Sequence, residues 1–163
     1  MKKIFYFLSL LLVITSCTED IKFNNPAFQG LNDNVFWRAN GYKANSVTNG
    51  NIIIEGTLGY EKVSLQIPSP VVKTYILGLD NVSTASYSNT LPGQLAEFNT
   101  GENKGTGQIV VTEYNTETNT ISGTFKFTAL NKDEADVEKP KVVFTEGVFY
   151  KVPVSSTSNF LVN

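Results

Sequence analysis

The sequence predicts an all-β domain, a single antiparallel meander of about ten strands that closes as a barrel or folds as a β-sandwich. Apolar and polar residues alternate with a period of two in several segments, as in half-buried strands. Turn signals such as Asn-Gly separate these segments at short intervals. No segment after residue 16 shows an apolar stripe at helical spacing. A closed or double-layered sheet is expected because it removes edges prone to aggregation.

The first element of the chain is a segment that we expect to be removed. Basic residues lie within 1–3, and an apolar run follows over 4–14, a layout typical of a secretory signal peptide. The run is too short to cross a bilayer, which takes roughly 20 apolar residues. Residues 1–16 are therefore predicted to be a lipoprotein signal peptide.

The only cysteine of the chain, Cys17, follows this segment. The residues ITSC over 14–17 resemble the bacterial lipobox, in which the cysteine is acylated, for example with palmitate, and becomes the first residue of the mature chain. A disulfide is excluded because there is no second cysteine. Each buried methylene contributes about 0.8 kcal/mol, so several acyl chains hold a protein firmly. The membrane is thus an expected partner through the lipid anchor.

The acidic pair Glu19 and Asp20 comes directly after the anchor. It resembles the export signal that sends lipoproteins of Bacteroidota to the outer face of the outer membrane. We therefore expect a lipid-anchored protein of the outer membrane that faces the cell surface, with the periplasm-facing orientation as the alternative.

Composition limits the chemistry and the partners. Two lysines leave with the signal segment, so the mature 147 residues carry 11 basic against 15 acidic side chains and lack a basic stripe for nucleic acid. The chain contains no histidine, which excludes Ser-His-Asp catalysis and histidine metal sites. The acidic residues Asp133, Glu134, Asp136 and Glu138 are interpreted as a solvated loop, because their spacing differs from a calcium loop. No enzyme activity, catalytic residue, metal or cofactor is expected.

The mature chain divides into two parts. Residues 17–34 are polar and rich in Asn, and they are predicted to be the lipidated N-terminus and a tether, while residues 35–163 form one β-rich domain. Asn40-Gly41 predicts a hairpin between 35–39 and 42–46, and Asn49-Gly50 predicts the next one.

The later segments alternate in the same way. We expect strands around 63–67, 74–79, 85–87, 107–114, 120–129 and 142–154, the last being one strand or two. In the segment TISGTFKFTA, Gly123 interrupts a bulky apolar row and is predicted to mark a bulge or a bend.

Aromatic side chains and one polar loop are the candidates for ligand contact. Most aromatics at alternating strand positions belong to the core, but we consider Trp37, Tyr87 and Phe98 as candidate contacts for a ligand. Residues 89–106 predict a long loop, and long loops without structure are uncommon unless they serve a function.

Five segments, together with the lipobox cysteine, resemble a family of small Bacteroidota lipoproteins classed as a domain of unknown function. They are PAFQG, FWRANGYKA, TYILG, GTGQIVVTEYNTETNTISGTFKFTA and VFTEGVFYKVPV. The resemblance covers nearly all of the mature chain and implies one β-rich domain in a bacterial envelope. It implies no activity and no functional residue beyond the lipidated Cys17.

Two functions follow as hypotheses. The first is a non-catalytic binding or accessory module on the membrane, with a glycan or an envelope protein as partner. The alternative is a lipocalin-like carrier of a small apolar ligand, with Phe125, Phe127 and Phe149 lining the cavity. A packed core favours the first, and a cavity of about 300 Å³ or more with few polar groups favours the second.

Overall fold

In a computed structural model, residues 25–47 and 50–156 are described, and they form eleven β-strands. Within these residues no helix is long and apolar enough to cross a membrane. In chain order the strands are β1 (Ala27–Asn32), β2 (Val35–Arg38), β3 (Gly41–Ser46), β4 (Ile52–Leu58), β5 (Glu61–Ile67), β6 (Thr74–Leu77), β7 (Thr84–Asn89), β8 (Ala96–Asn99), β9 (Thr106–Asn115), β10 (Thr120–Asn131) and β11 (Lys141–Ser156).

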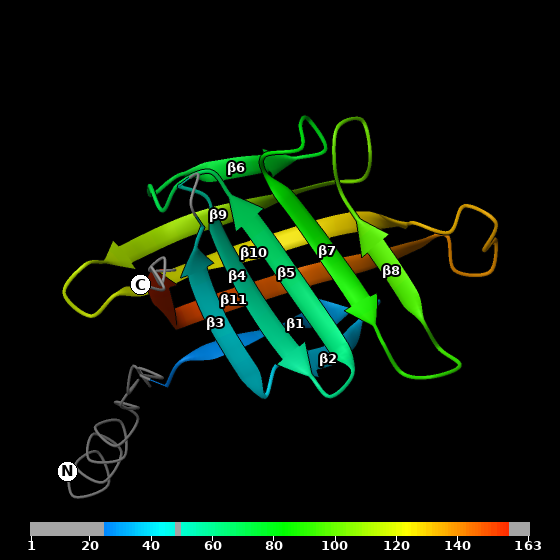
Figure 1. The fold of residues 1–163 in the computed structure, drawn as a ribbon, viewed down its shortest axis with the longest axis horizontal. Coiled ribbons are helices and arrows are strands. Elements are labelled where there is room, and N and C mark those ends of the chain that lie inside the picture. Colours follow the sequence, from blue (N-terminus) through cyan, green and yellow to red (C-terminus); the bar gives the residue numbers. More distant parts are fainter. Residues whose placement is uncertain (1–24, 48–49, 157–163) are drawn as a thin grey trace, which may run out of the picture.

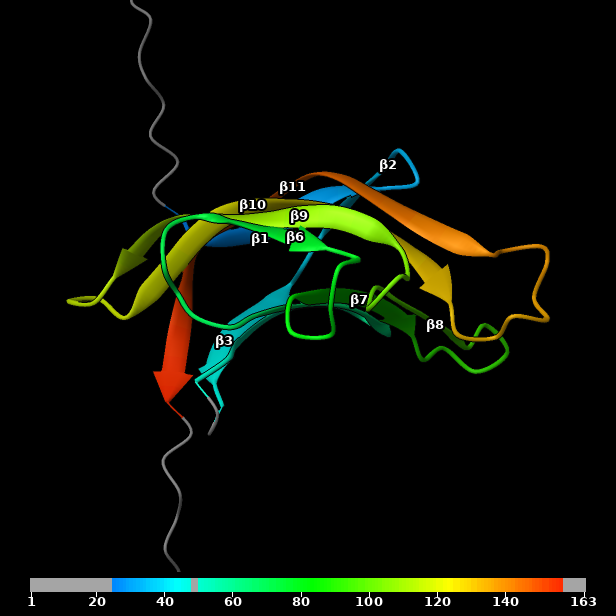
Figure 2. The ribbon, with the colours of Figure 1, turned by 90° about the horizontal axis from the view of Figure 1, so that it is seen from above.

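The strands form one continuous sheet that folds over into two layers. Their order is β2-β1-β11-β3-β4-β5-β7-β8-β10-β9-β6, and a further pairing of β11 with β10 closes a ring through seven strands. Figures 1 and 2 show the layer of β2, β1, β11, β10, β9 and β6 facing the layer of β3, β4, β5, β7 and β8. The predicted all-β, barrel-like or sandwich fold is confirmed.

Strand β11 joins the two layers. Along most of its length it lies between β10 and β1, both antiparallel to it, and residues 154–156 then pair with β3 in parallel. This parallel pairing departs from a purely antiparallel meander, because the 16-residue strand is long enough to leave one layer and enter the other. Glu146 has a φ of 51°, and the register shifts beside it. The segment predicted as one strand or two is thus a single strand with a bulge at this point.

The hairpin predicted at Asn40-Gly41 is wrong. Strand β2 pairs with β1 through a two-residue turn at Asp33 and Asn34, whose φ angles are 47° and 66°. At residues 39–41 the chain passes between the layers instead: the Ala39 N–H bonds to Phe28 of β1, and the Asn40 N–H bonds to Thr57 of β4. The next predicted hairpin is present, since β3 and β4 are antiparallel.

Strand β1 lies within residues 17–34, which are predicted to be the lipidated N-terminus and a tether. It runs between β2 and β11, and its Phe28 side chain is fully buried. The sheet therefore begins at Ala27, because burial of one large ring fixes a segment that is otherwise polar.

The period-two patterns of the later strands place their apolar side chains in the core. Val63, Leu65 and Ile67 of β5 are fully buried, as are Ile121 and Ala129 of β10. The predicted irregularity at Gly123 is present as a register shift in the pairing of β10 with both β9 and β11.

Three phenylalanine rings lie directly against glycines, and we call these the Phe-over-Gly contacts. A Cβ on Gly56 of β4 would lie 2.6 Å from the Phe28 ring of the opposite layer. The other two contacts are reciprocal between neighbouring strands. A Cβ on Gly123 of β10 would collide with the Phe149 ring of β11 and with the carbonyl oxygen of Val110 in β9, and one on Gly147 of β11 would lie 2.6 Å from the Phe125 ring of β10. Only glycine leaves room for the rings at these positions.

We predict that Gly56→Ala lowers the free energy of unfolding by about 1–3 kcal/mol, because the new methyl group overpacks the Phe28 ring. Combination with Phe28→Leu should cost less than the sum of the single changes by at least about 0.5 kcal/mol. Urea unfolding of the chain from Thr18 onward measures both quantities. The control is Gly59→Ala, where the φ is +58° but nothing lies within 4 Å of the added Cβ. Its cost should simply add to that of Phe28→Leu, and additivity at Gly56 would contradict the packing argument.

Candidate functional site

The three aromatic residues considered as candidate ligand contacts lie in the core. Trp37 and Tyr87 are 3% exposed and Phe98 is fully buried. Their rings pack on one another and on Phe144: Trp37 is edge-on to it at 5.9 Å, and Tyr87 lies 5.5 Å from it and 6.0 Å from Phe98. The inward-facing strand positions thus place these rings where they offer almost no surface to a ligand in solution.

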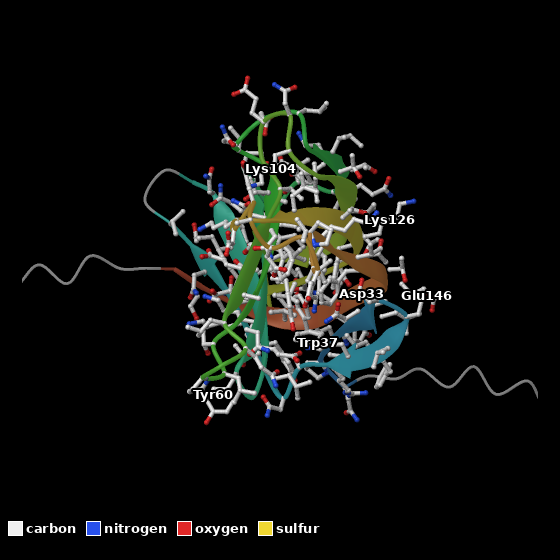
Figure 3. All side chains as sticks on the ribbon, turned by 90° about the vertical axis from the view of Figure 1, so that its right-hand side faces the viewer. Asp33, Trp37, Tyr60, Lys104, Lys126 and Glu146 are labelled. Carbon is white, nitrogen blue, oxygen red and sulfur yellow. The ribbon has the colours of Figure 1, made fainter. Side chains whose placement is uncertain are left out.

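Polar groups of two of these residues meet one carboxylate between the layers. The Trp37 Nε1–H of β2 donates a hydrogen bond of 2.5 Å to Glu61 Oε2 of β5. Burial, followed by the negative charge of Glu61, raises the pKa of Tyr87 to about 12. Figure 3 shows Trp37 pointing into the space between the layers. Because the contact joins β2 to β5 across that space, its evident role is to hold the layers in register.

The predicted long loop over 89–106 is wrong, because β8 lies inside it and pairs with β7 and β10. The neighbouring acidic segment is an ordered turn: Asp136 Oδ1 accepts the N–H groups of Glu138 and Lys139. The Lys132 Nζ lies 2.6 Å from Glu97 Oε1 across the space between the two segments. An open hollow of about 320 Å³ lies here. Of the charged residues that line it, Glu97 and Lys132 pair with each other, and Asp133 and Asp136 accept backbone N–H groups within the turn.

We call the layer of β2, β1, β11, β10, β9 and β6 the long layer. A larger groove lies on its outer face, and we call it the Tyr150 groove. It has a volume of about 600 Å³. The described residues that line it come from β1, β2, β11 and the segment just before β1: Asn25, Ala27, Gln29, Arg38, Val148 and Tyr150.

The strand register explains why these residues share a face. Side chains alternate across a strand, and inward-facing Phe28, Trp37 and Phe149 leave their neighbours in sequence on the outside. Gln29 lies opposite Arg38 on one side and opposite Val148 on the other, and Ala27 lies opposite Tyr150. The groove is therefore built from neighbouring positions on three paired strands.

Hydrogen bonds and charge define the chemistry of the groove. The Arg38 Nη1 donates to Gln29 Oε1 at 3.2 Å, which uses one of the five N–H groups of the guanidinium. The Lys151 Nζ lies 5.4 Å from the centre of the Tyr150 ring. Among the described lining residues there is no carboxylate. The groove thus combines an aromatic ring and planar polar groups with positive charge, although the chain as a whole is acidic.

Sequence reasoning missed this groove because its residues come from positions far apart in the chain. Arg38 is the only arginine of the sequence, and this was the one feature of the sequence that could have pointed to the groove. The predicted anchor and export residues Cys17, Glu19 and Asp20 lie outside the described residues.

The comparisons define the class of protein first. Residues 1–18 match a prokaryotic membrane lipoprotein lipid attachment site, so the chain is a membrane-anchored lipoprotein with an all-β domain. Residues 24–153 match the family described as Domain of unknown function (DUF6252), and the chain belongs to this family. No curated protein and no solved structure matches the chain.

We predict that the free energy of unfolding decreases as the pH rises, because Tyr87 ionises. An unfolded tyrosine ionises near pH 10, whereas folded Tyr87 holds its proton to about pH 12. The stabilisation is therefore complete below about pH 10 and is lost as the pH rises towards about 12. Urea unfolding should show a smaller loss over this range for Tyr87→Phe than for the parent chain. Tyr60→Phe, at an exposed turn position, is the control and should behave as the parent does. Equal losses in all three chains would remove Tyr87 as the cause.

Proposed function

We propose that the protein is a non-catalytic binding module of the bacterial envelope that binds glycans in the Tyr150 groove. The observation that carries the proposal is the composition of the groove. Aromatic rings stack on the apolar faces of sugars, and planar amide and guanidinium groups hydrogen-bond to their hydroxyls. Tyr150, Gln29, Asn25 and Arg38 supply these groups within one groove of about 600 Å³.

A non-catalytic role is supported by the kinds of side chain that the sequence contains. There is no histidine in the sequence, and the single cysteine lies at the lipid attachment site. These features favour binding over turnover.

A binding surface is better supported than a lipocalin-like carrier. The rings considered as a cavity lining pack against their neighbours: Phe127 is stacked on Phe144 at 4.9 Å and on Phe125 at 6.1 Å. Phe149 lies against Gly123 in a Phe-over-Gly contact. A core packed in this way favours a ligand on the outside.

The membrane location of the module is the second part of the proposal. The acidic pair Glu19 and Asp20 after the anchor cysteine supports the outer membrane and the cell surface. A module held there meets glycans of the cell's own envelope and of its surroundings.

On a glycan array, the chain from Thr18 onward should bind a subset of glycans, and Tyr150→Ala should weaken that binding by at least about fivefold, the equivalent of about 1 kcal/mol. The matched control is Tyr60→Ala, which removes a tyrosine that is 60% exposed in the turn between β4 and β5. Figure 3 shows Tyr60 on the side of the opposite layer. Binding that is absent from the array, or that falls equally in both variants, would reject the groove as a glycan site.

Cys17→Ala should abolish acylation and leave the chain unprocessed, because both steps need the thiol. Labelling of growing cells with radioactive palmitate measures the first effect, and the size of the protein on a gel measures the second. Label retained by the variant would show that the anchor lies elsewhere. Ser16→Ala is the control, since it changes a neighbouring small residue and should leave labelling intact.

A further inference from the structure

We propose that the Tyr150 groove takes the phosphorylated sugar headgroup of a glycolipid in the same membrane that holds the anchor. This inference rests on the proposed function, and it adds the class of ligand and its location. Two observations carry it: the position of the groove relative to the anchor, and its charge.

The anchor restricts how far the groove can lie from the membrane. Asn25 lines the groove, and it follows Cys17 by eight positions. Even a fully extended chain spans at most about 3.6 Å per residue, so Asn25 lies within about 29 Å of the acylated cysteine. That distance is close to the roughly 30 Å thickness of the bilayer's hydrocarbon core. The groove therefore stays near the headgroups of the membrane.

A short anchor also favours ligands within the membrane over ligands in solution. Linking a site to the surface that carries its ligand raises the effective concentration, to about the millimolar range for a short flexible link. An open groove of modest affinity is then filled by lipid headgroups within reach, whereas a free sugar needs a much higher concentration.

The charge of the groove selects an anionic sugar. Arg38 lines the groove, and the described lining lacks a carboxylate. A guanidinium matches the geometry of a phosphate with two parallel hydrogen bonds. With Arg38 on the phosphate, Gln29 and Asn25 are left for sugar hydroxyls and Tyr150 for the face of the ring. A phosphorylated sugar meets all of these groups, whereas a plain phospholipid meets only the cation.

The test uses the full-length, lipidated protein in phosphatidylethanolamine vesicles. The probe is monophosphoryl lipid A with a photoreactive group on its sugar headgroup, and mass spectrometry locates the cross-links. We expect cross-links in β1 and β11, and Arg38→Gln should reduce them by at least about fivefold. The matched control is Lys126→Gln, which removes a positive charge from the same layer at an exposed position of β10. It should leave the yield within about twofold of the parent.

Two further arms separate the sources of the ligand. Photoreactive phosphatidylglycerol carries the phosphate without the sugar and should label the groove weakly, and labelling equal to that by the glycolipid would overturn the inference. Soluble glucosamine 1-phosphate, added at micromolar concentration, should compete poorly with the membrane glycolipid. Efficient competition would show that proximity to the membrane does not matter, and would overturn the inference.

The outcome also separates this inference from the proposed function. Glycan-array binding that depends on Tyr150, without groove cross-links from the membrane glycolipid, overturns the inference and leaves the glycan-binding function standing. The absence of both overturns the two together.

Discussion

The two layers depend on one close contact, the Phe28 ring against the backbone of Gly56. Protein interiors are close-packed, and the Phe28 ring occupies the space that a side chain at position 56 would need. The same device recurs within the long layer, where the reciprocal Phe-over-Gly contacts join β10 to β11. The core is therefore specified by paired choices, a large ring on one strand and a glycine on a facing or neighbouring strand, as well as by apolar residues.

The Tyr150 groove lies on the outer face of the strands whose inner face carries Phe28 and Phe149. Because Phe28 and Phe149 face inward, Gln29, Val148 and Tyr150 face outward, and the pairing of β2, β1 and β11 sets the spacing between them. Side chains on paired strands hold their positions better than side chains on loops. A binding surface built in this way is formed before its ligand arrives.

Local patterns in the sequence predicted the strands well, but they did not predict which strands pair with each other. The alternation in β5 and β10 identified the strands and their buried faces, because the period of two is contained in each segment. The Asn40-Gly41 signal failed because the groups that decide the path there, on Phe28 and Thr57, lie far away in the chain. For the same reason neither the burial of Trp37 nor the meeting of Arg38 with Tyr150 could be predicted, since each depends on which strands become neighbours.

Strand β11 follows the other ten described strands in the chain, and this order determines when the fold can form. Strand β1 pairs with β11 on one side and with only the four-residue β2 on the other. Strand β3 pairs with the last three residues of β11. These contacts join distant parts of the chain, and such contacts form slowly. A chain threaded through a narrow pore from its N-terminus therefore lacks the closing strand until β11 has emerged. The topology itself delays folding until that point.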